Sequence, residues 1–482
     1  EVLFLRGIIM RLEKMICSDN ATIKDVMMRI DENAKGTAFI TDDTGRMVGI
    51  MTDGDIRRLL ISGYGLNDCI KTHIKRDFEY ALVSDKPADI ASKFNYYIKI
   101  IPIVNREMRL IDYVCYDENV HISLAQPQLN GNEYKYLMDA FLSTWISSTG
   151  KYIQRFEESF SEYCGVKYGV ATSNGTTALH LALTALGIGK GDEVIVPDIT
   201  FAATINAVLY TGATPVIVDI EEDSWCIDPD EIQKAVTPRT KAGIPVHIYG
   251  QPCDMEKICS IAQENNLYIV EDCAEAHGAE WGNKKVGSFG IISCFSFFGN
   301  KVVTTGEGGM CITDSEALNE RMRILRDHGM SKERKYYHEV VGFNYRMTNL
   351  QAAIGTAQIE RIDEILKWRE ALEDQYREIF ADIAGVTLQS NTLRNRRKIA
   401  WLVSVLVSED KRDEILLHLK ENDIDARAFF IPLSEMEIYS EFARECPKSK
   451  LISKMGINLP TTFEINKDHI ERIKALFVSG LQ

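Results

Sequence analysis

Short apolar runs that alternate with amphipathic segments occupy the middle of the chain. Runs this short are typical of buried strands separated by helices. They lie at residues 169–171, 193–196, 215–218, 244–247, 267–270 and 292–296. Continuous apolar strands between helices predict a mostly parallel α/β sheet that is covered on both faces. Ligands bind such sheets at the carboxyl ends of the strands, so we expect the chemistry in the loops that follow these runs.

Different patterns flank this region on its two sides. Before it, helix and strand patterns over 21–60 recur in weaker form over 84–114, which predicts a small α/β module with two related halves. After it, a long helical stretch leads to strand, helix and strand patterns, which predict a small α+β domain. We therefore expect five segments: a tail or expression-vector remnant at 1–9, the α/β module at 10–118, a linker at 119–132, a large domain at 133–382 and the small domain at 383–482.

Composition narrows the class of protein. With 45% hydrophobic and 26% charged residues, the chain is typical of a soluble globular protein. No apolar run approaches the roughly 20 residues that a membrane-spanning helix needs. The net charge of −15 argues against a nucleic-acid partner. The eleven cysteines form no CxxC pair and no ligand cluster, so we expect reduced thiols in a cytoplasmic protein, and no metal site.

One lysine lies between an aromatic run and a turn rich in small residues. Lys301 follows Phe295-Ser296-Phe297-Phe298-Gly299-Asn300 and precedes Thr304-Thr305-Gly306-Glu307-Gly308-Gly309, with two valines between. A lysine that is partly desolvated there holds its ammonium form less strongly, and its free amine is a nucleophile that forms a Schiff base with an aldehyde cofactor. The alternative is an ordinary surface lysine in a hairpin turn.

Three strand ends carry further candidate chemistry. Residues 172–177 turn into a helix N-terminus whose free N–H groups suit a phosphate, although an ordinary threonine N-cap explains them equally well. Asp272 directly follows a strand, where a carboxylate either pairs with a pyridine nitrogen or merely caps the next helix. Phe201 follows another strand and either offers a ring for stacking or belongs to the core.

The segment around Lys301 resembles the lysine segment of the DegT/StrS family of pyridoxal-phosphate-dependent sugar aminotransferases. The resemblance extends from about Ile122 to the end of the chain and implies the fold-type-I architecture, a mostly parallel sheet covered by helices with a small α+β C-terminal domain. It implies pyridoxal 5′-phosphate as the cofactor, joined to Lys301. It also implies these cofactor contacts: Asp272 at the ring nitrogen, Glu275 beside the 3-hydroxyl, Phe201 on the ring face, and Thr176, Thr177 and Ser296 at the phosphate.

A second segment, Gly342-Phe343-Asn344-Tyr345-Arg346-Met347, resembles the part of that family which reaches a neighbouring subunit. There the asparagine contacts the cofactor phosphate of the partner, so Asn344 implies a homodimer with shared sites. Arg346 and His328 are candidates for substrate contact. A structural role stays open for both: a salt bridge for Arg346 and a helix-end cap for His328.

The resemblance implies transamination of a nucleotide-linked keto sugar with glutamate as the amino donor, because a lysine and not a histidine stands at position 301. A GDP-linked 4-keto-6-deoxy sugar is the leading expectation. Two alternatives stay open: a UDP- or dTDP-linked keto sugar, and a non-catalytic regulator that senses a nucleotide and merely keeps the fold. The intact set of Lys301, Asp272 and Ser296 argues against the regulator.

In the N-terminal module, Gly49-Ile50-Met51-Thr52-Asp53-Gly54-Asp55 resembles the signature of a CBS domain. The resemblance implies that Thr52 and Asp55 meet the ribose and phosphate of an adenosine nucleotide, while capping of the next helix explains both residues without a ligand. No Thr-x-x-Asp follows the last strand of the second copy, so we expect at most one conventional nucleotide site in a CBS pair. Whether the module senses a nucleotide or only helps assembly stays open.

Overall fold

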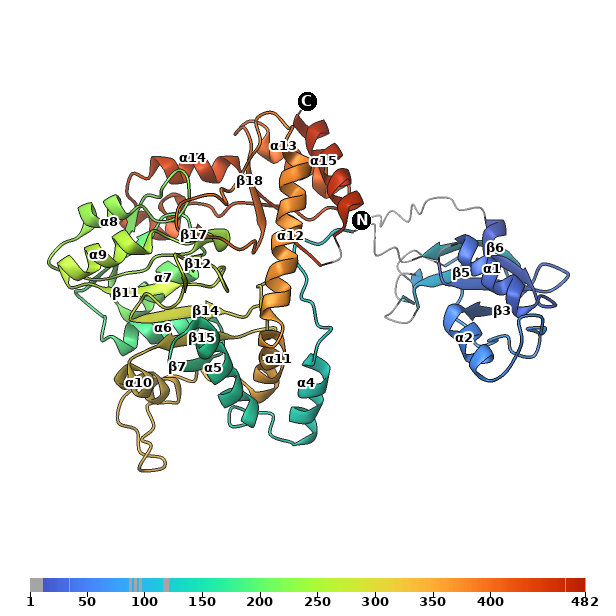
Figure 1. The fold of residues 1–482 in the computed structure, drawn as a ribbon, viewed down its shortest axis with the longest axis horizontal. Coiled ribbons are helices and arrows are strands. Elements are labelled where there is room, and N and C mark those ends of the chain that lie inside the picture. The colour runs from blue at the N-terminus through green and yellow to red at the C-terminus, as the bar shows by residue number, and fades with distance from the viewer. Residues whose placement is uncertain are drawn as a thin grey trace. The chain divides into compact units, whose positions relative to one another are not determined.

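The computed structural model describes residues 12–33, 35–85, 89–90, 93–94, 98–115, 121–463 and 465–481. The tail expected at 1–9 lies outside the described residues. The chain divides into two compact units, Glu1–His121 and Ile122–Gln482, and each is described here by itself (Figure 1).

The first unit contains two small sheets with the same order of strand directions. In each, a parallel pair is followed by an antiparallel partner, and helices of the first half bury Val26, Ile30 and Ile56 against the first sheet. The elements are β1 (Ile16–Ser18), α1 (Ile23–Asn33), β2 (Thr37–Thr41), β3 (Met47–Thr52), α2 (Asp53–Ile61), β4 (Ala81–Leu82), β5 (Ile100–Val104) and β6 (Leu110–Cys115).

A seven-stranded sheet organises the second unit, with the strand order β7-β15-β14-β11-β10-β8-β9. Its strands are parallel except β15, which is antiparallel to both of its neighbours. The strands are β7 (Tyr168–Thr172), β8 (Glu193–Pro197), β9 (Thr214–Val218), β10 (Thr240–Gly243), β11 (Tyr268–Asp272), β14 (Ile292–Ser296) and β15 (Gly309–Thr313). This is the mostly parallel sheet that the sequence predicts.

Helices cover both faces of this sheet because its strands are apolar on both sides. In β8, Val194 and Val196 point into one core while Ile195 points into the other. The helices of this region are α4 (Glu133–Leu142), α5 (Lys151–Cys164), α6 (Gly175–Ala185), α7 (Ala203–Thr211), α8 (Pro229–Ala235), α9 (Met255–Asn265), α10 (Glu316–Arg326) and α11 (Asn349–Ile359). Continuous burial on both faces fixes the sheet as the centre of the unit.

The strand expected at 244–247 begins four residues earlier, as β10. Residues 244–247 are nevertheless buried, because Ile244 N–H donates to the Ile195 carbonyl and His247 N–H to the Asp272 carbonyl. The apolar run therefore marks a buried segment just beyond the strand. β15 has no counterpart among the predicted runs, since its apolar part is only Met310-Cys311-Ile312, between Gly309 and Thr313.

The long helix α12 (Ile362–Phe380) leads into a smaller, antiparallel α+β region (Figure 1). Its sheet has the order β16-β18-β20-β19 and packs Val405 against Phe380 and Phe477. The remaining elements are β12 (Glu280–Trp281), β13 (Lys284–Lys285), β16 (Thr387–Leu388), β17 (Arg396–Arg397), β18 (Val403–Leu406), α13 (Arg412–Glu421), β19 (Arg427–Ala428), α14 (Pro447–Met455), β20 (Gly456–Leu459) and α15 (Lys467–Leu481).

The segment from Ile122 onward belongs to the second unit, although the sequence places it in a linker. Ile122 N–H donates to the Asp423 carbonyl at 2.9 Å, and Asp425 N–H donates to the Ile122 carbonyl at 2.8 Å. These bonds tie the segment to the smaller region. Within the part of the chain that the structure describes, no helix is both long and apolar enough to span a bilayer.

Candidate active site

The carboxyl ends of two neighbouring strands bring the central candidates together. β11 ends at Asp272 and β14 ends at Ser296, and the two strands pair in parallel with Asp272 opposite Cys294. The turn that carries Lys301 follows β14, so the lysine returns over the same edge of the sheet. This is the edge at which a parallel sheet binds ligands.

Lys301 is held in a closed turn and is largely desolvated. Its N–H donates to the Phe298 carbonyl at 2.9 Å, and its side chain is only 12% exposed. Its Nζ lies 3.7 Å from Oε1 of Glu275. Burial lowers the pKa of Lys301, and the carboxylates of Glu275 and Asp272 oppose that shift. A buried amine of lowered pKa is the nucleophile that the sequence predicts at this position.

Asp272 is buried at the end of β11 and is oriented by a threonine of helix α7. Thr204 of α7 donates its hydroxyl to Oδ2 at 2.8 Å, and the Ala274 N–H reaches Oδ1 at 3.2 Å. Burial raises the pKa of this carboxyl, against those hydrogen bonds and the charge of Lys301. A protonated ring nitrogen is the kind of cation that would favour the ionised form here.

Glu271 precedes Asp272 and faces the other side of the sheet. Its pKa is shifted in the opposite direction. Its carboxylate accepts the N–H groups of Gly287, Phe289 and Gly290, together with the Ser293 hydroxyl and His247 Nε2. Burial alone would raise its pKa, but these partners hold the pKa below the usual value. Although the ligand atoms of His247, Glu271 and Cys273 lie within 4.8 Å of one another, the glutamate is already saturated with donors. We assign it to holding the strand end that carries Asp272.

Glu275 lies one turn beyond Asp272 and faces the lysine. It is 4% exposed and accepts the Tyr249 N–H at 2.8 Å through Oε2. Burial raises its pKa to about 7, while the charge of Lys301 opposes the shift. Glu275 therefore exchanges a proton near neutral pH, next to the site of chemistry.

The N-terminus of α6 faces Ser296, as the two phosphate candidates require. Gly175 allows this approach, because a Cβ on it would lie 2.8 Å from Cβ of Ser296. The Thr177 hydroxyl is occupied in the helix cap, where it donates to the Asn174 carbonyl at 2.8 Å. No hydrogen bond among the described residues engages the Thr176 hydroxyl. Free N–H groups, a free hydroxyl and the positive end of a helix together suit a phosphate.

The other predicted residues lie in more varied surroundings. Phe201 is 61% exposed, with its ring 6.0 Å from that of Phe430, so one face remains available for stacking. Asn344 is exposed on a bridge to Asp327. Arg346 forms an ion pair with Asp327, and His328 adopts φ 58° just beyond α10. Arg346 thus shows the salt bridge that the sequence left open, whereas the His328 N–H donates to the Phe343 carbonyl and Asp327 caps the helix. Contact of either residue with substrate stays a prediction.

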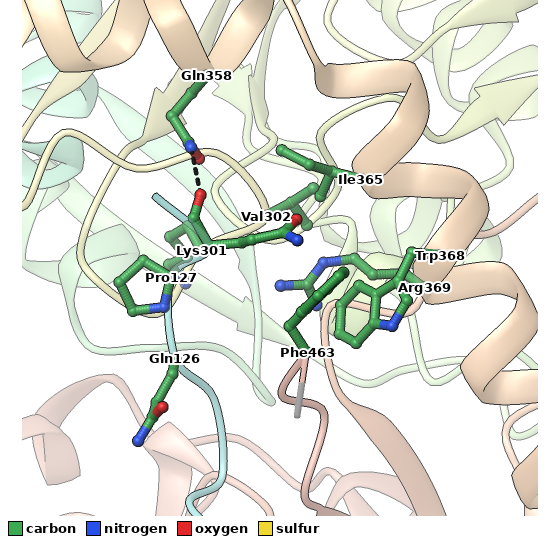
Figure 2. A pocket seen from close by; sticks show the side chains of 10 residues that line it. Gln126, Pro127, Lys301, Val302, Gln358, Ile365, Trp368, Arg369 and Phe463 are labelled. Atoms are coloured by element: carbon green, nitrogen blue, oxygen red, sulfur yellow. Dashed lines mark hydrogen bonds between the residues drawn. The ribbon is translucent and has the colours of Figure 1, made fainter. Parts of the chain in front are cut away.

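A small, partly open pocket adjoins Lys301 (Figure 2). Arg369 of α12 reaches into it, and Phe463 and Trp368 lie beside the arginine (Figure 2). The remaining lining residues are Gln126, Pro127, Gln128, Val302, Gln358 and Ile365. The chain before α4 thereby contributes to the surroundings of the lysine.

Sequence reasoning did not single out three residues that lie at or beside this site. Glu271 looks like an ordinary strand-end acid, and its five donors come from the loop at 287–290, from Ser293 of β14 and from His247. Trp401, whose ring centroid lies 3.7 Å from Lys301 Nζ, and Arg369 belong to segments that meet the lysine only after folding. An isolated tryptophan or arginine in a sequence carries no signal of such a contact.

Comparison with known proteins agrees with this geometry. The family model of the DegT/DnrJ/EryC1/StrS aminotransferases matches residues 127–477, and a CBS domain model matches residues 6–62. The chain belongs to this aminotransferase family. The GDP-perosamine synthases of Caulobacter vibrioides and Escherichia coli O157:H7 are 45% and 43% identical to it over 358 and 351 residues, in each case 73% of this chain and 96% of the relative.

A solved structure shows the same fold. The putative sugar aminotransferase Spr1654 from Streptococcus pneumoniae, in its PMP form, superposes with a TM-score of 0.71 at 26% identity, over 75% of this chain and 98% of that one. The chain is accordingly a pyridoxal-phosphate-dependent sugar aminotransferase of fold type I with an N-terminal CBS domain. The sequence-based predictions of family, fold and cofactor are confirmed.

The site fits pyridoxal phosphate on its own chemistry. Asp272 is a buried carboxyl whose raised pKa a cationic ring nitrogen would lower, and α6 offers N–H groups to a phosphate across from Ser296. When bound, the cofactor supplies an electron sink for the bond that breaks at the substrate Cα. The protein supplies a buried amine at Lys301, a carboxylate for the ring nitrogen and a water-poor setting for both.

Proposed function

We propose that this chain transfers the amino group of glutamate to C4 of GDP-4-keto-6-deoxymannose and thereby makes GDP-perosamine for surface polysaccharide such as O-antigen. Two GDP-perosamine synthases at 43–45% identity over nearly their whole length support this substrate. The observation that carries the proposal is the convergence of Lys301, Asp272 and Glu275 at one sheet edge. That set supports catalysis over a purely regulatory role.

In this proposal Lys301 moves the proton, and other residues hold the cofactor. With the cofactor bound, Lys301 would take a proton from the substrate Cα and return one, because its buried amine has a lowered pKa. Asp272 stays ionised against the ring nitrogen and is held in place by Thr204. Thr176, Ser296 and the N-terminus of α6 bind the phosphate, and Phe201 stacks on the ring.

Product analysis tests the substrate. The purified protein is incubated with glutamate and, separately, with the GDP-, UDP- and dTDP-linked 4-keto-6-deoxy sugars, and the products are identified by mass spectrometry. We expect an amino sugar from the GDP substrate and none from the same reaction with Lys301→Ala. An amino sugar from a UDP- or dTDP-linked substrate alone would replace the proposed sugar. No product from any of them, with no colour change on adding glutamate, would favour the regulator.

We further propose that the enzyme is a homodimer with shared sites. Exposed apolar side chains support this, since Phe141, Leu142, Trp145 and Ile146 are 46–72% exposed within six residues. Exposed apolar groups at this density mark interaction surfaces. Asn344 is exposed as well, as a residue that serves a neighbouring subunit must be.

Complementation tests the shared site. Lys301→Ala and Asn344→Ala are each purified, mixed, dissociated and reassociated. If each site draws Lys301 from one subunit and Asn344 from the other, mixed dimers contain one intact site, and roughly a quarter of all sites recover. A mixture no more active than the separate variants would exclude sharing through Asn344. Sedimentation of the wild-type protein as a monomer would exclude the dimer itself.

A further inference from the structure

Trp401 reaches the catalytic lysine from the smaller region of the second unit. It lies just before β18 and is 4% exposed. Its Nε1 donates to the Asn300 carbonyl at 2.8 Å, and its ring centroid lies 3.7 Å from Lys301 Nζ. One side chain thus contacts two consecutive residues of the lysine turn, the first through its edge and the second through its face.

A buried arginine fixes the backbone of this tryptophan. Arg369 of α12 is 3% exposed, and its Nη1 donates to the carbonyls of Ala400 and Trp401 at 3.0 and 2.9 Å. Among the described residues, no carboxylate pairs with this guanidinium, and its Nε has no hydrogen-bond partner. The bonds that Arg369 makes therefore serve the segment that carries Trp401.

We propose that Trp401 is a positioning residue that holds the amine of Lys301 whenever this amine is not bonded to the cofactor. The ring attracts the ammonium through its π face, and such attraction is stronger in a desolvated site than at a surface. Oε1 of Glu275 lies 3.7 Å from the same nitrogen and pairs with the ammonium. The amine is thereby kept within reach of the reacting atoms, and Arg369 sets the position of the ring. The inference rests on the proposed role of Lys301 in proton transfer.

The groups around the lysine all bear on its protonation. The carboxylates of Glu275 and Asp272 favour the ammonium, and burial disfavours it. His277 is fully buried among Phe160, Phe295 and Phe297 with a pKa lowered to about 3, so it is neutral near Lys301. The ring of Trp401, which carries no charge, also attracts the Lys301 ammonium. Removing the ring should therefore lower the pKa of Lys301. If the ring only shielded the amine from water, its removal would raise that pKa.

The experiment titrates Lys301 in the apoprotein by amine labelling. The cofactor is removed, the protein is labelled with an amine-reactive reagent across a pH series, and the Lys301 peptide is quantified by mass spectrometry. In Trp401→Leu the labelling midpoint is expected to fall by about 0.5 to 1.5 pH units, because the ammonium loses its ring. Trp401→Phe keeps an aromatic face and shifts less. Trp281→Leu, which removes a ring under Arg396 and away from the lysine, leaves the midpoint unchanged.

An upward shift in Trp401→Leu would overturn the proposal, because it would mean that the indole merely shields the amine from water. An unchanged midpoint would overturn it as well. If the leucine variant does not fold, apoprotein fluorescence serves instead: Lys301→Met changes the tryptophan emission in the wild-type background and not in Trp401→Phe. Equal changes in both backgrounds refute the contact. None of these readouts needs a sugar substrate, so they fail independently of the proposed function.

Discussion

The two units each present a threonine and an aspartate at an element end, and the two pairs behave differently. In the first unit, Asp55 Oδ2 accepts both the N–H and the hydroxyl of Thr52, at 2.9 and 2.7 Å, and Arg58 binds the other oxygen. In the second, Asp272 accepts the Thr204 hydroxyl at one oxygen and the Ala274 N–H at the other, yet burial still raises its pKa. The first aspartate has a lowered pKa and an arginine partner within one helix turn, whereas the hydrogen bonds of the second do not offset its burial.

The hydrogen-bond partners of each aspartate and the shift of its pKa, more than the sequence motif, thus separate a structural pair from a functional one. Thr52 and Asp55 form a complete capping box at the start of α2, which is the explanation that needs no ligand. A nucleotide at these residues would have to compete with those bonds, so the adenosine nucleotide expected there stays a prediction. Buried groups with shifted pKa values and incomplete partners are the ones that mark chemistry. The predictions below test this contrast between the two units.

The largest effect is expected at the lysine. Lys301→Met should lower the rate of amino transfer by roughly 10⁴-fold, because it removes the amine that carries the proton. Its free energy of unfolding should not fall, since the change replaces a desolvated amine by an apolar chain of similar length. Half-reaction absorbance and urea unfolding of the apoprotein measure the two quantities. Lys332→Ala, at an exposed pair with Glu320, is the control and leaves both unchanged.

A loss of much less than 10⁴-fold in Lys301→Met would contradict this prediction. Retained activity close to that of the wild type would mean that another base serves the site. A strong loss of stability would mean that the lysine is part of the core architecture and not an unsatisfied group held for chemistry.

The next effect concerns Glu275 and pH. Its pKa is raised to about 7 from 4.5 by burial, so the folded state keeps a proton that the unfolded state has lost between these values. The protonated Glu275 therefore contributes to the free energy of unfolding in full below about pH 4.5. This contribution, about 3 kcal/mol, is lost as pH rises through about 7. Glu275→Gln removes the titration. In urea unfolding of the apoprotein, the variant should gain stability relative to the wild type between pH 5 and pH 8.

If the free energy of unfolding changes with pH in the same way in the wild type and in Glu275→Gln, the raised pKa does not belong to Glu275. Glu271→Gln is the matched comparison, because the pKa of Glu271 is held low by its donors. In that variant the amide cannot accept all five bonds, and stability should fall at both pH values.

Much of the catalytic sheet follows from the sequence, and the reasons are local. The apolar runs at β8, β9, β11 and β14 predict buried parallel strands, and the rule of carboxyl ends then places Asp272 and Lys301 at one edge. The run at 244–247 misleads because Ile244 and Val246 are as buried beyond the strand as residues within it. Trp401 and Arg369 lie far from Lys301 in sequence, and their contacts arise only from packing of the smaller region.

A smaller effect is expected from the hydroxyl that orients Asp272. Thr204→Val keeps the shape of the side chain and removes its hydrogen bond to Oδ2. A hydrogen bond to a charged group contributes about 1.5–3 kcal/mol, so the affinity for pyridoxal phosphate should fall roughly tenfold or more. Equilibrium dialysis of the apoprotein measures this. Thr184→Val, whose hydroxyl bonds only the His180 carbonyl within α6, should leave the affinity unchanged. An unchanged affinity in Thr204→Val would show that Asp272 is held without it.

The smallest effect lies in the first unit and completes the contrast. Thr52→Ala removes the N-cap of α2 and should destabilise that unit by about 0.5–2 kcal/mol, with no change in the half-reaction of the lysine site. The five tryptophans all lie in the second unit, so hydrogen exchange of peptides from 37–61 is the suitable measure. Thr52→Ser keeps the hydroxyl and should restore protection. If Thr52→Ala slows amino transfer while Thr52→Ser does not, the capping box influences the active site, and the prediction is wrong.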